Sequence, residues 1–376
     1  CHLLQGGRHL ANVAVLYPGD CEWGGAAMEL QVVARVLQQA QIEFDVVSAD
    51  MLAEAAEISE GKGNFTINGQ SFSWLVIPEC DGIPASAASF AKGLAGEQVL
   101  FVNRKPNRLL GQERAVRKQL SGEGTSQKDL PGETVCLEEL AAYLRERQAE
   151  PVFLPESWKD LVYYHYQGEQ ELFMFHNESA FDPFQGEIAL PLVRGAVFYD
   201  GMEDACYALP VREECGQKFV RIELAPCASC VIIDRDSSDL PVYEMLSEKL
   251  SACDANTRLE GSWSYALATE KQFPRTTDAG VMEKLGPVSD FLPKFSGHVF
   301  YEKAFDLPDK PQRAYLEFSE VHECLELYVN NVRIGDALSM PYVFEVTEAL
   351  AEGTNRIRAI VTSNPDRDQA NYPEHP

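Results

Sequence analysis

The chain has 376 residues, of which 45% are hydrophobic and 24% charged, a globular composition with enough length for two or three domains. Its formal net charge of -26, from 58 acidic and 32 basic residues, argues against a protein that binds nucleic acid by neutralising phosphates, and it disfavours anionic membrane surfaces. No apolar run approaches the roughly 18 residues of a membrane span.

The start of the chain and its cysteines bear on its origin and compartment. The chain begins with Cys1 rather than Met and shows neither the basic region nor the cleavage site of a signal peptide, so we expect a piece of a longer polypeptide. Ten cysteines lie at uneven spacing, which favours reduced thiols in a reducing compartment over a disulfide framework, and we expect a bacterial cytoplasmic location. The pair Cys227-x-x-Cys230 has the spacing of half a zinc site, but no second Cys or His pair lies nearby, so we expect no metal.

Strands and helices alternate along residues 1–150. Asn12 to Tyr17 (NVAVLY) is a continuous apolar run of the kind that forms a buried parallel strand. Strands are expected at 12–17, 42–47, 73–78 and 98–103, and helices at 26–40, 85–94 and 137–147. Such alternation predicts an open, doubly wound α/β sheet of the flavodoxin-like type, in which ligands bind at the carboxyl ends of the strands.

The loops at those carboxyl ends carry few signs of chemistry. The loop at 18–29 (PGDCEWGGAAME) lacks both GxGxxG and the Walker motif, and its Asp20 and Glu22 would repel a phosphate. The domain resembles the class I glutamine-amidotransferase-like fold, whose cysteine nucleophile lies on a sharp turn after a strand and pairs with a His and an acid. Cys80 is the only thiol near such a position, but it follows the third strand instead of the next one, and no His follows it in this domain. We expect no amidotransferase activity.

Residues 151–236 are rich in short β-strands separated by Gly, Pro, Asn and Asp. Strands are expected at 160–166, 171–177, 187–192, 196–199, 219–224 and 229–234. This pattern predicts a small antiparallel β-sandwich. His165 and His176 lie on successive strands and could face each other, either as metal ligands or as a polar cross-strand pair. Because two nitrogens without a nearby carboxylate are insufficient for a metal, we favour the polar pair.

The last part of the chain contains a clear hairpin. A connecting helix is expected at 240–254, within a linker of residues 237–256, and the last domain spans 257–376. Before residue 330, apolar Leu325, Leu327 and Val329 alternate with polar or aromatic residues, which predicts a strand with one buried face. Asn330 and Asn331 then tolerate the positive φ of a type I′ turn, and a second strand follows.

The order of elements after this hairpin resembles a known domain. Thr347 is expected to cap one helical turn, and Gly353 to end it before a last strand at 356–362. An aromatic strand, the YVNNVRIG hairpin, Phe-x-Val-Thr and Gly-Thr-Asn before a final strand are similar to the galactose-binding-like jelly roll of family 2 and related glycoside hydrolases. The hairpin of that family usually ends in Asn-Gly; Asn331 replaces the glycine here and can adopt the same backbone conformation.

Three aromatic residues of this domain are candidates for contact with carbohydrate. Trp263 lies near its beginning, where an exposed indole face could stack on a sugar ring, although an indole also serves as a core residue. Tyr328 lies on the polar phase of its strand and is expected to be exposed. For Tyr301 the sequence does not decide between contact with sugar and a place in the core. Whether the domain holds Ca²⁺ is also open, because oxygen ligands cannot be counted from spacing.

The whole chain resembles the C-terminal region of the α-L-rhamnosidase family 106. The similarity lies in GGRHLANVAVLYP, in the strand pair that ends in Asn177, and in the order of an amidotransferase-like module, a small sandwich and a jelly roll. In that family a catalytic (β/α)8 barrel precedes these modules and carries the acid and base; no array of roughly 250 residues of this kind is present here.

This resemblance implies a function without catalysis in the chain itself. None of the 58 acidic residues is singled out as one of the two carboxyl groups that glycoside hydrolysis needs. We therefore expect an accessory region of a glycoside hydrolase, with no catalytic residue, cofactor or metal, whose partners are carbohydrate and the barrel of the same polypeptide. An autonomous carbohydrate-binding protein is the alternative, and a degenerate amidotransferase-like enzyme is a third hypothesis.

Overall fold

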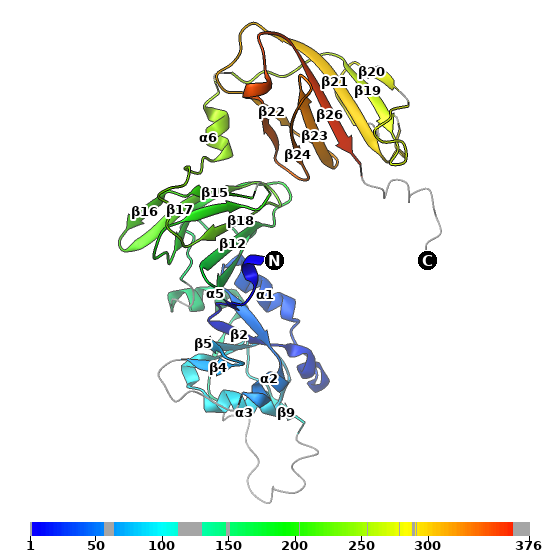
Figure 1. Cartoon of the computed structure of the whole chain (residues 1–376). Coiled ribbons are helices and arrows are strands. Elements are labelled where there is room, and N and C mark those ends of the chain that lie inside the picture. The colour runs from blue at the N-terminus through cyan, green and yellow to red at the C-terminus, as the bar shows by residue number, and fades with distance from the viewer. Residues whose placement is uncertain are drawn as a thin grey trace, which may run out of the picture. The chain divides into compact units, whose positions relative to one another are not determined.

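The computed structural model in Figure 1 describes residues 2–55, 64–111, 130–147, 151–202, 204–253, 255–277, 279–287, 290 and 292–363. The chain divides into two compact units, which we call unit 1 (Cys1–Tyr243) and unit 2 (Glu244–Pro376). Unit 1 thus holds both the α/β part and the first β-rich part expected from the sequence. The finer domain boundaries at 150, 236 and 256 stay a prediction. None of the described helices is long and apolar enough to cross a membrane.

A five-stranded parallel sheet forms the α/β part of unit 1. Its strands lie in the order β10 (Glu133–Val135), β8 (Val99–Val102), β6 (Trp74–Ile77), β2 (Val13–Leu16) and β3 (Phe44–Val47). Every pair is parallel. Strands β2 and β8 are buried along their whole length, which agrees with their uninterrupted apolar sequences. Numbered in chain order, the strands lie 2-1-3-4-5.

Helices cover both faces of this sheet. Helices α1 (Leu30–Gln39) and α5 (Leu137–Glu146) share one hydrophobic core with Val13, Val15 and Val76. Helices α2 (Ala49–Glu54) and α3 (Ala85–Gly93) share another core with Ala14, Leu16 and Leu75 on the opposite face. Two-sided burial explains why alternating hydrophobicity is absent from these strands.

Short elements complete the α/β part. They are η2 (Pro18–Gly24), η3 (Gly96–Gln98), the hairpin of β4 (Phe65–Ile67) and β5 (Gln70–Phe72), and the parallel pair of β7 (Gly82–Pro84) and β9 (Arg108–Leu110). The first short helix, η1 (His2–Leu4), instead packs near Tyr166, whose hydroxyl donates to the carbonyl of Leu4. The helix predicted from residue 26 begins only at Leu30. Its first residues are used otherwise, because Ala27 forms a β-bridge with Cys80 and Met28 donates its N–H to the carbonyl of Glu79.

Two antiparallel sheets form the rest of unit 1. The larger has the order β1 (Arg8–His9), β11 (Leu161–Gln167), β12 (Glu171–Asn177), β18 (Ser229–Ile233), β14 (Val197–Asp200) and β15 (Ala205–Ala208). The smaller has the order β13 (Phe184–Leu190), β17 (Gln217–Leu224) and β16 (Val211–Glu214). One core, with Phe173, Phe175 and Ile188 among its members, lies between them. The six predicted strands are confirmed, whereas β1, β15 and β16 were not predicted.

The expected pairing of His165 with His176 is wrong. His165 lies opposite Phe173, and His176 lies opposite Val162. Because 173 and 176 differ by an odd number on one strand, the two imidazoles point to opposite faces of the sheet. His165 instead bonds to Glu171 through Nε2, at 2.7 Å, within its own hairpin.

Unit 2 contains a six-stranded sheet and a strand pair. The sheet has the order β20 (Ala279–Met282), β19 (Trp263–Ala268), β21 (His298–Leu307), β26 (Gly353–Thr362), β23 (Cys324–Val329) and β24 (Val332–Ala337), and β22 (Tyr315–Phe318) pairs with β25 (Tyr342–Glu345). Among the described residues of unit 2, α6 (Leu246–Ser251) and η7 (Thr347–Ala349) form short helices. The helix expected at 240–254 is shorter, because Val242 instead bridges to Ala208 within unit 1.

The predicted hairpin is confirmed, and its turn depends on the two asparagines. Asn330 and Asn331 have φ of 51° and 66°, the left-handed region that a type I′ turn requires. Gly353, at φ 85°, also adopts the expected conformation. Thr347 is not the helix cap: Val346 holds that position without a side-chain bond, and the Thr347 hydroxyl accepts from the Ala314 N–H at 3.0 Å.

Asn330 also fastens the hairpin to the last strand. Its Nδ2 donates to the carbonyl of Ala349 and to Oδ1 of Asn355, both at 2.8 Å, and its Oδ1 accepts from the Arg356 N–H. Asn355 is fully buried and satisfies both its donors on the carbonyls of Ala351 and Gly353. A buried polar group is tolerated only when it is bonded in this way.

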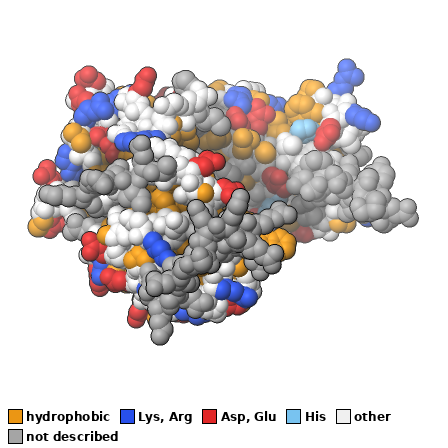
Figure 2. All heavy atoms as spheres, turned by 90° about the horizontal axis from the view of Figure 1, so that it is seen from below, with side chains coloured by type: hydrophobic (Ala, Val, Ile, Leu, Met, Phe, Trp, Pro, Cys, Tyr) orange, Lys and Arg blue, Asp and Glu red, His pale blue; other side chains and the backbone are white. Residues whose placement is uncertain are grey.

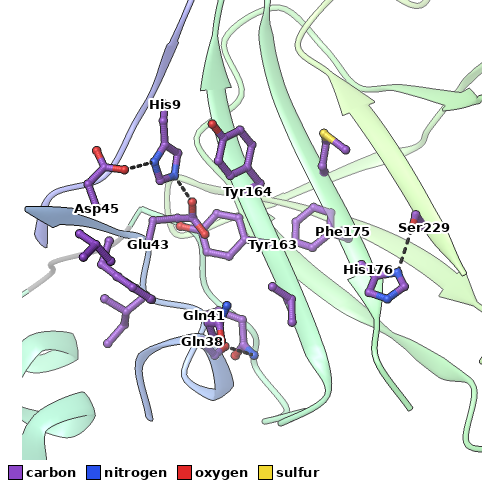
Figure 3. Close-up of a pocket in the computed structure, with 15 residues that line it drawn as sticks. His9, Gln38, Gln41, Glu43, Asp45, Tyr163, Tyr164, Phe175, His176 and Ser229 are labelled. Atoms are coloured by element: carbon purple, nitrogen blue, oxygen red, sulfur yellow. Dashed lines mark hydrogen bonds and ion pairs between the residues drawn. The ribbon is translucent and has the colours of Figure 1, made fainter. Parts of the chain in front are cut away.

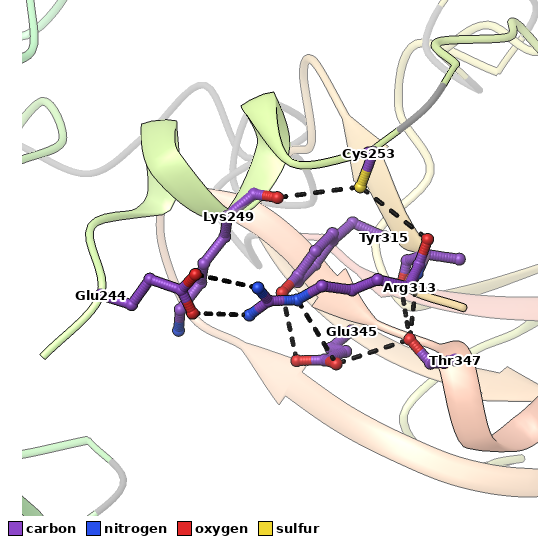
Figure 4. A network of polar contacts seen from close by, with 8 residues as sticks. Glu244, Lys249, Cys253, Arg313, Tyr315, Glu345 and Thr347 are labelled. Atoms are coloured by element: carbon purple, nitrogen blue, oxygen red, sulfur yellow. Dashed lines mark hydrogen bonds and ion pairs between the residues drawn. The ribbon is translucent and has the colours of Figure 1, made fainter. Parts of the chain in front are cut away.

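An ion pair connects the first residue of unit 2, Glu244, to Arg313, which lies just before strand β22, as Figure 4 shows. Both terminal nitrogens of Arg313 donate to Glu244, at 2.9 and 2.7 Å, and this contact holds the pKa of the Glu244 carboxyl below its usual value. The guanidinium also lies 5.4 Å from the centre of the Tyr315 ring. Bidentate geometry makes the contact directional.

The two hairpin asparagines allow a matched test of these bonds. Asn330→Gly keeps a residue that tolerates positive φ but removes three hydrogen bonds, so we expect the free energy of unfolding of unit 2 to fall by about 2 to 3 kcal/mol. Asn331→Gly removes an exposed side chain at a similar φ and should change the free energy of unfolding of unit 2 by less than about 0.5 kcal/mol. Urea denaturation followed by tryptophan fluorescence, to which Trp263 contributes from unit 2, measures both; equal effects would contradict the anchoring role.

Candidate functional site

A cavity of about 480 Å³ lies in unit 1, where the edge strand β3 of the parallel sheet meets β11, β12 and the start of β18 (Figure 3). Its volume falls within the roughly 300–1,000 Å³ of small-molecule sites. It is lined by both charged and apolar side chains. We treat it as the candidate functional site.

His9 forms the charged wall of this cavity. It is the last residue of β1, and its Nδ1 bonds to Oδ1 of Asp45 at 2.8 Å while its Nε2 bonds to the carboxylate of Glu43. Glu43 and Asp45 are two residues apart in an extended segment and so share one face of it. The ring of His9 stacks on Tyr164 of β11, with centroids 4.2 Å apart and planes 7° from parallel.

This arrangement makes His9 a cation at neutral pH. Burial opposes its charged form, but the hydrogen bonds and charges of Asp45 and Glu43 outweigh burial and raise the pKa of His9 to about 9. Burial also raises the pKa of Glu43, and the contact with His9 limits that rise. An imidazolium therefore lies between two carboxyl groups, only 14% of its side chain being exposed.

Gln41 is a buried residue whose side-chain hydrogen bonds hold the same wall of the cavity in place. It is 2% exposed and has φ of 51°, and its Nε2 donates to the carbonyls of Leu161 (2.8 Å) and Trp158 (3.0 Å). Its Oε1 accepts from Arg145 of α5 at 3.4 Å. These bonds hold the end of α1 against the start of β11, so the cavity has a rigid side.

The opposite wall belongs to the antiparallel sheet. His176 bonds through Nδ1 to the hydroxyl of Ser229 at 2.9 Å, and Val162 and Met174 contribute apolar surface. Tyr164 is 36% exposed; burial and the charges of Asp45 and Glu43 raise the pKa of its phenol. The cavity thus combines apolar side chains with hydroxyl, imidazole, amide and carboxylate groups.

The two carboxyl groups of the cavity are not arranged for hydrolysis of a glycosidic bond. Such chemistry needs two carboxyl groups on opposite sides of the scissile bond. Glu43 and Asp45 instead lie on one segment and converge on one imidazole (Figure 3). In this arrangement the two carboxyl groups hold the imidazolium of His9.

The aromatic residues expected to contact sugar lie elsewhere, in unit 2. Trp263 is 4% exposed and Tyr301 is 7% exposed, and both belong to the core of the sheet. A buried indole cannot stack on a ligand, so the structure favours the core role for Trp263 that the sequence left open. Tyr328 is half-buried: its hydroxyl donates to Glu326, and the guanidinium of Arg358 lies 4.4 Å from its ring centre.

Cys80 is not placed as a nucleophile. It is 1% exposed, and a hydrogen bond with the thiol of Cys21, followed by burial, raises its pKa. The reactive thiolate is therefore disfavoured. Cys227 is exposed while Cys230 is buried, so the CxxC pair does not present two thiols to one side.

The surface shows how the charge of the chain is distributed. In Figure 2, the described part of the face seen from below carries red acidic and blue basic side chains interspersed, with orange apolar ones between them. Several acidic groups are paired with arginine; Arg104, for example, bonds to both Glu79 and Asp81 at 2.7 Å. On this face the excess of acidic residues does not form one patch.

His9, Glu43 and Asp45 were not identified from the sequence. The signal available was the alternation of Glu43 and Asp45 in IEFDVV, which places two carboxyl groups on one side of a strand. His9 is 34 residues away from Glu43, and its contact depends on the pairing of β1 with β11. No local pattern encodes that pairing.

Comparison with known proteins shows where this fold occurs. No family model matches the chain. A β-glucuronidase of Formosa agariphila is 31% identical over 86 residues, 21% of this chain and 9% of that protein. The rhamnosidase of Novosphingobium sp. PP1Y matches 97% of this chain and 36% of its own chain, with a TM-score of 0.66 at 16% identity. An α-L-fucosidase of Paenibacillus thiaminolyticus matches 63% of this chain with a TM-score of 0.39 at 12% identity.

The chain therefore spans only a fraction of the proteins that it resembles, 9% of the glucuronidase and 36% of the rhamnosidase. The likeness to the rhamnosidase extends over nearly all of this chain and concerns its fold. The chain has a multidomain, mixed α/β fold rich in β-sheets that also occurs within a rhamnosidase.

The charge of His9 predicts a pH-dependent stability. Because the folded pKa is raised from 6.5 to about 9, the contribution of His9 is fully present below pH 6.5 and is lost as the pH rises through 9. We expect His9→Gln to lower the free energy of unfolding on the order of 2 kcal/mol near pH 6, and the difference from the wild type to shrink toward pH 9 and above. Thermal denaturation across this range measures it.

His322→Gln is the matched control for this prediction. His322 is 58% exposed and bonds only to Glu320 among the described residues. Its replacement should leave the pH profile of stability unchanged. A constant difference between His9→Gln and the wild type at all pH values would show that His9 does not carry a raised pKa.

The environment of Cys80 predicts slow alkylation. With iodoacetamide at neutral pH, the exposed Cys136, Cys215 and Cys227 should react first, and the buried Cys80 and Cys21 only after unfolding. Peptide mapping by mass spectrometry over time follows each thiol, and the same reaction in urea is the control. Faster labelling of Cys80 than of the three exposed thiols would restore the hypothesis of an amidotransferase-like nucleophile.

Proposed function

We propose that this chain is a non-catalytic accessory region of an α-L-rhamnosidase-like glycoside hydrolase, which supports a catalytic barrel of the same polypeptide and contacts carbohydrate. The observation that carries the proposal is the match of 97% of this chain to 36% of a rhamnosidase, with a TM-score of 0.66. A match of this kind is what an accessory region would give, because most of the longer protein lies outside it. A cytoplasmic location belongs to the same proposal.

The finer assignment of the fold is part of the proposal. The strand order 2-1-3-4-5 of the parallel sheet supports a flavodoxin-like, amidotransferase-like module. The order of the antiparallel sheets in unit 2, with the YVNNVRIG hairpin at their edge, supports a galactose-binding-like jelly roll. The relation to rhamnosidase family 106 rests on these modules and on their order along the chain.

The position of the carboxyl groups supports a role without catalysis. Glu43 and Asp45 are the acidic side chains that line the cavity of unit 1, and both are held by His9. The alternative function, an autonomous carbohydrate-binding protein, is favoured by the cavity itself, since a binding site would operate without a barrel. The two hypotheses differ in what precedes the chain in its gene.

An activity assay tests the proposal directly. The purified chain should release no nitrophenol from 4-nitrophenyl α-L-rhamnoside or β-D-galactoside above the rate in buffer. The variants Glu43→Gln and Asp45→Asn are assayed in parallel, because each removes the charge of one of the two carboxyl groups in the cavity. Turnover by the wild type that either variant abolishes would overturn the proposal, as would a gene in which no barrel of roughly 250 residues is encoded with this chain.

A further inference from the structure

We propose that the cavity beside His9 binds a neutral, hydroxyl-rich ligand of one or two sugar rings. The cavity and its charged side chains are observed in the structure of unit 1 and do not depend on the proposed function. The choice of a sugar among hydroxyl-rich ligands rests on the proposed function. The site belongs to unit 1, whereas the aromatic residues that the sequence suggested belong to unit 2.

The polar groups of the cavity suit hydroxyls. Asp45 uses one carboxylate oxygen for His9, and its side chain is 35% exposed. Tyr164 has a hydroxyl without a hydrogen-bond partner among the described residues, and His176 uses only Nδ1 there. Acceptors and donors are therefore both present around one volume, and a hydroxyl group can satisfy either.

The remaining lining suits the carbon skeleton of a sugar. Val46, Val162 and Met174 contribute apolar surface beside these polar groups. Tyr164 is held in place by its stack on His9, so its ring loses little freedom when a ligand binds. A cavity with an apolar surface and a few fixed polar groups is the usual form of a small-molecule site.

The charges of the cavity select against anions. The imidazolium of His9 is bonded to both Glu43 and Asp45, so its charge is already compensated, and the carboxyl groups outnumber it. A uronate or a phosphate would meet these carboxyl groups without an available cation in the wall. A neutral sugar meets no such repulsion, and the cavity should discriminate between neutral and acidic sugars of the same size.

Calorimetric titration of the intact chain tests this inference. L-Rhamnose, L-fucose, D-galactose and D-glucuronate are the probes, and at least one neutral sugar should bind with a Kd on the order of 1 mM, with D-glucuronate at least about tenfold weaker. Ser229→Phe fills the cavity from an exposed position and should weaken binding of the neutral sugar at least about tenfold. Tyr328→Ala, in unit 2, is the matched control and should leave the affinity unchanged; circular dichroism checks that both variants fold.

Each outcome decides the inference. No saturable binding of any neutral sugar, binding that Tyr328→Ala abolishes while Ser229→Phe does not, or equal affinity for D-glucuronate would each overturn it. Binding lost with Ser229→Phe alone supports it. The binding experiment and the activity assay test different proposals. Turnover of a rhamnoside would overturn the accessory role but would leave the inference about sugar binding in the cavity intact.

Discussion

The contact of His9 with Glu43 and Asp45 is the interaction on which the architecture of unit 1 depends. The first strand, β1, pairs with β11 in the antiparallel sheet, and only a few residues later the chain enters β2, which lies between β6 and the edge strand β3 of the parallel sheet. The chain thus crosses between the two sheets within its first residues. Charges buried at such a crossing are stable only if they are paired, and the imidazolium supplies the pairing for two carboxyl groups.

The same constraint explains why a cavity lies there. Strand β3 is an edge of the parallel sheet, and an exposed edge has to be covered or made polar. Gln41 and His9 connect this edge to β11 through directional bonds rather than through close packing of apolar side chains. The cavity lies between these two surfaces, beside the bonds that connect them.

The large aromatic residues of the two units lie in different surroundings. In unit 2, Trp263 and Tyr301 complete the core between the strands, which is where a large ring contributes most to stability. In unit 1, Tyr164 lies at the rim of the cavity with its ring supported by His9. Trp263 and Tyr301 are thus part of the core of unit 2, whereas Tyr164, which is 36% exposed, lines the cavity of unit 1.

Local patterns determined many, but not all, of the elements of this protein. The uninterrupted apolar run at Val13–Leu16 indicated a strand buried on both faces, and the Asn330-Asn331 pair indicated a turn with positive φ, because both depend on neighbours in sequence. Strand β16 was missed, since all its side chains are exposed and no alternation marks it. The burial of Trp263, the pairing of β1 with β11 and the convergence of His9 on Glu43 were decided by the tertiary structure alone. Each brings together residues that are far apart in the chain, and such contacts leave no periodic trace in sequence.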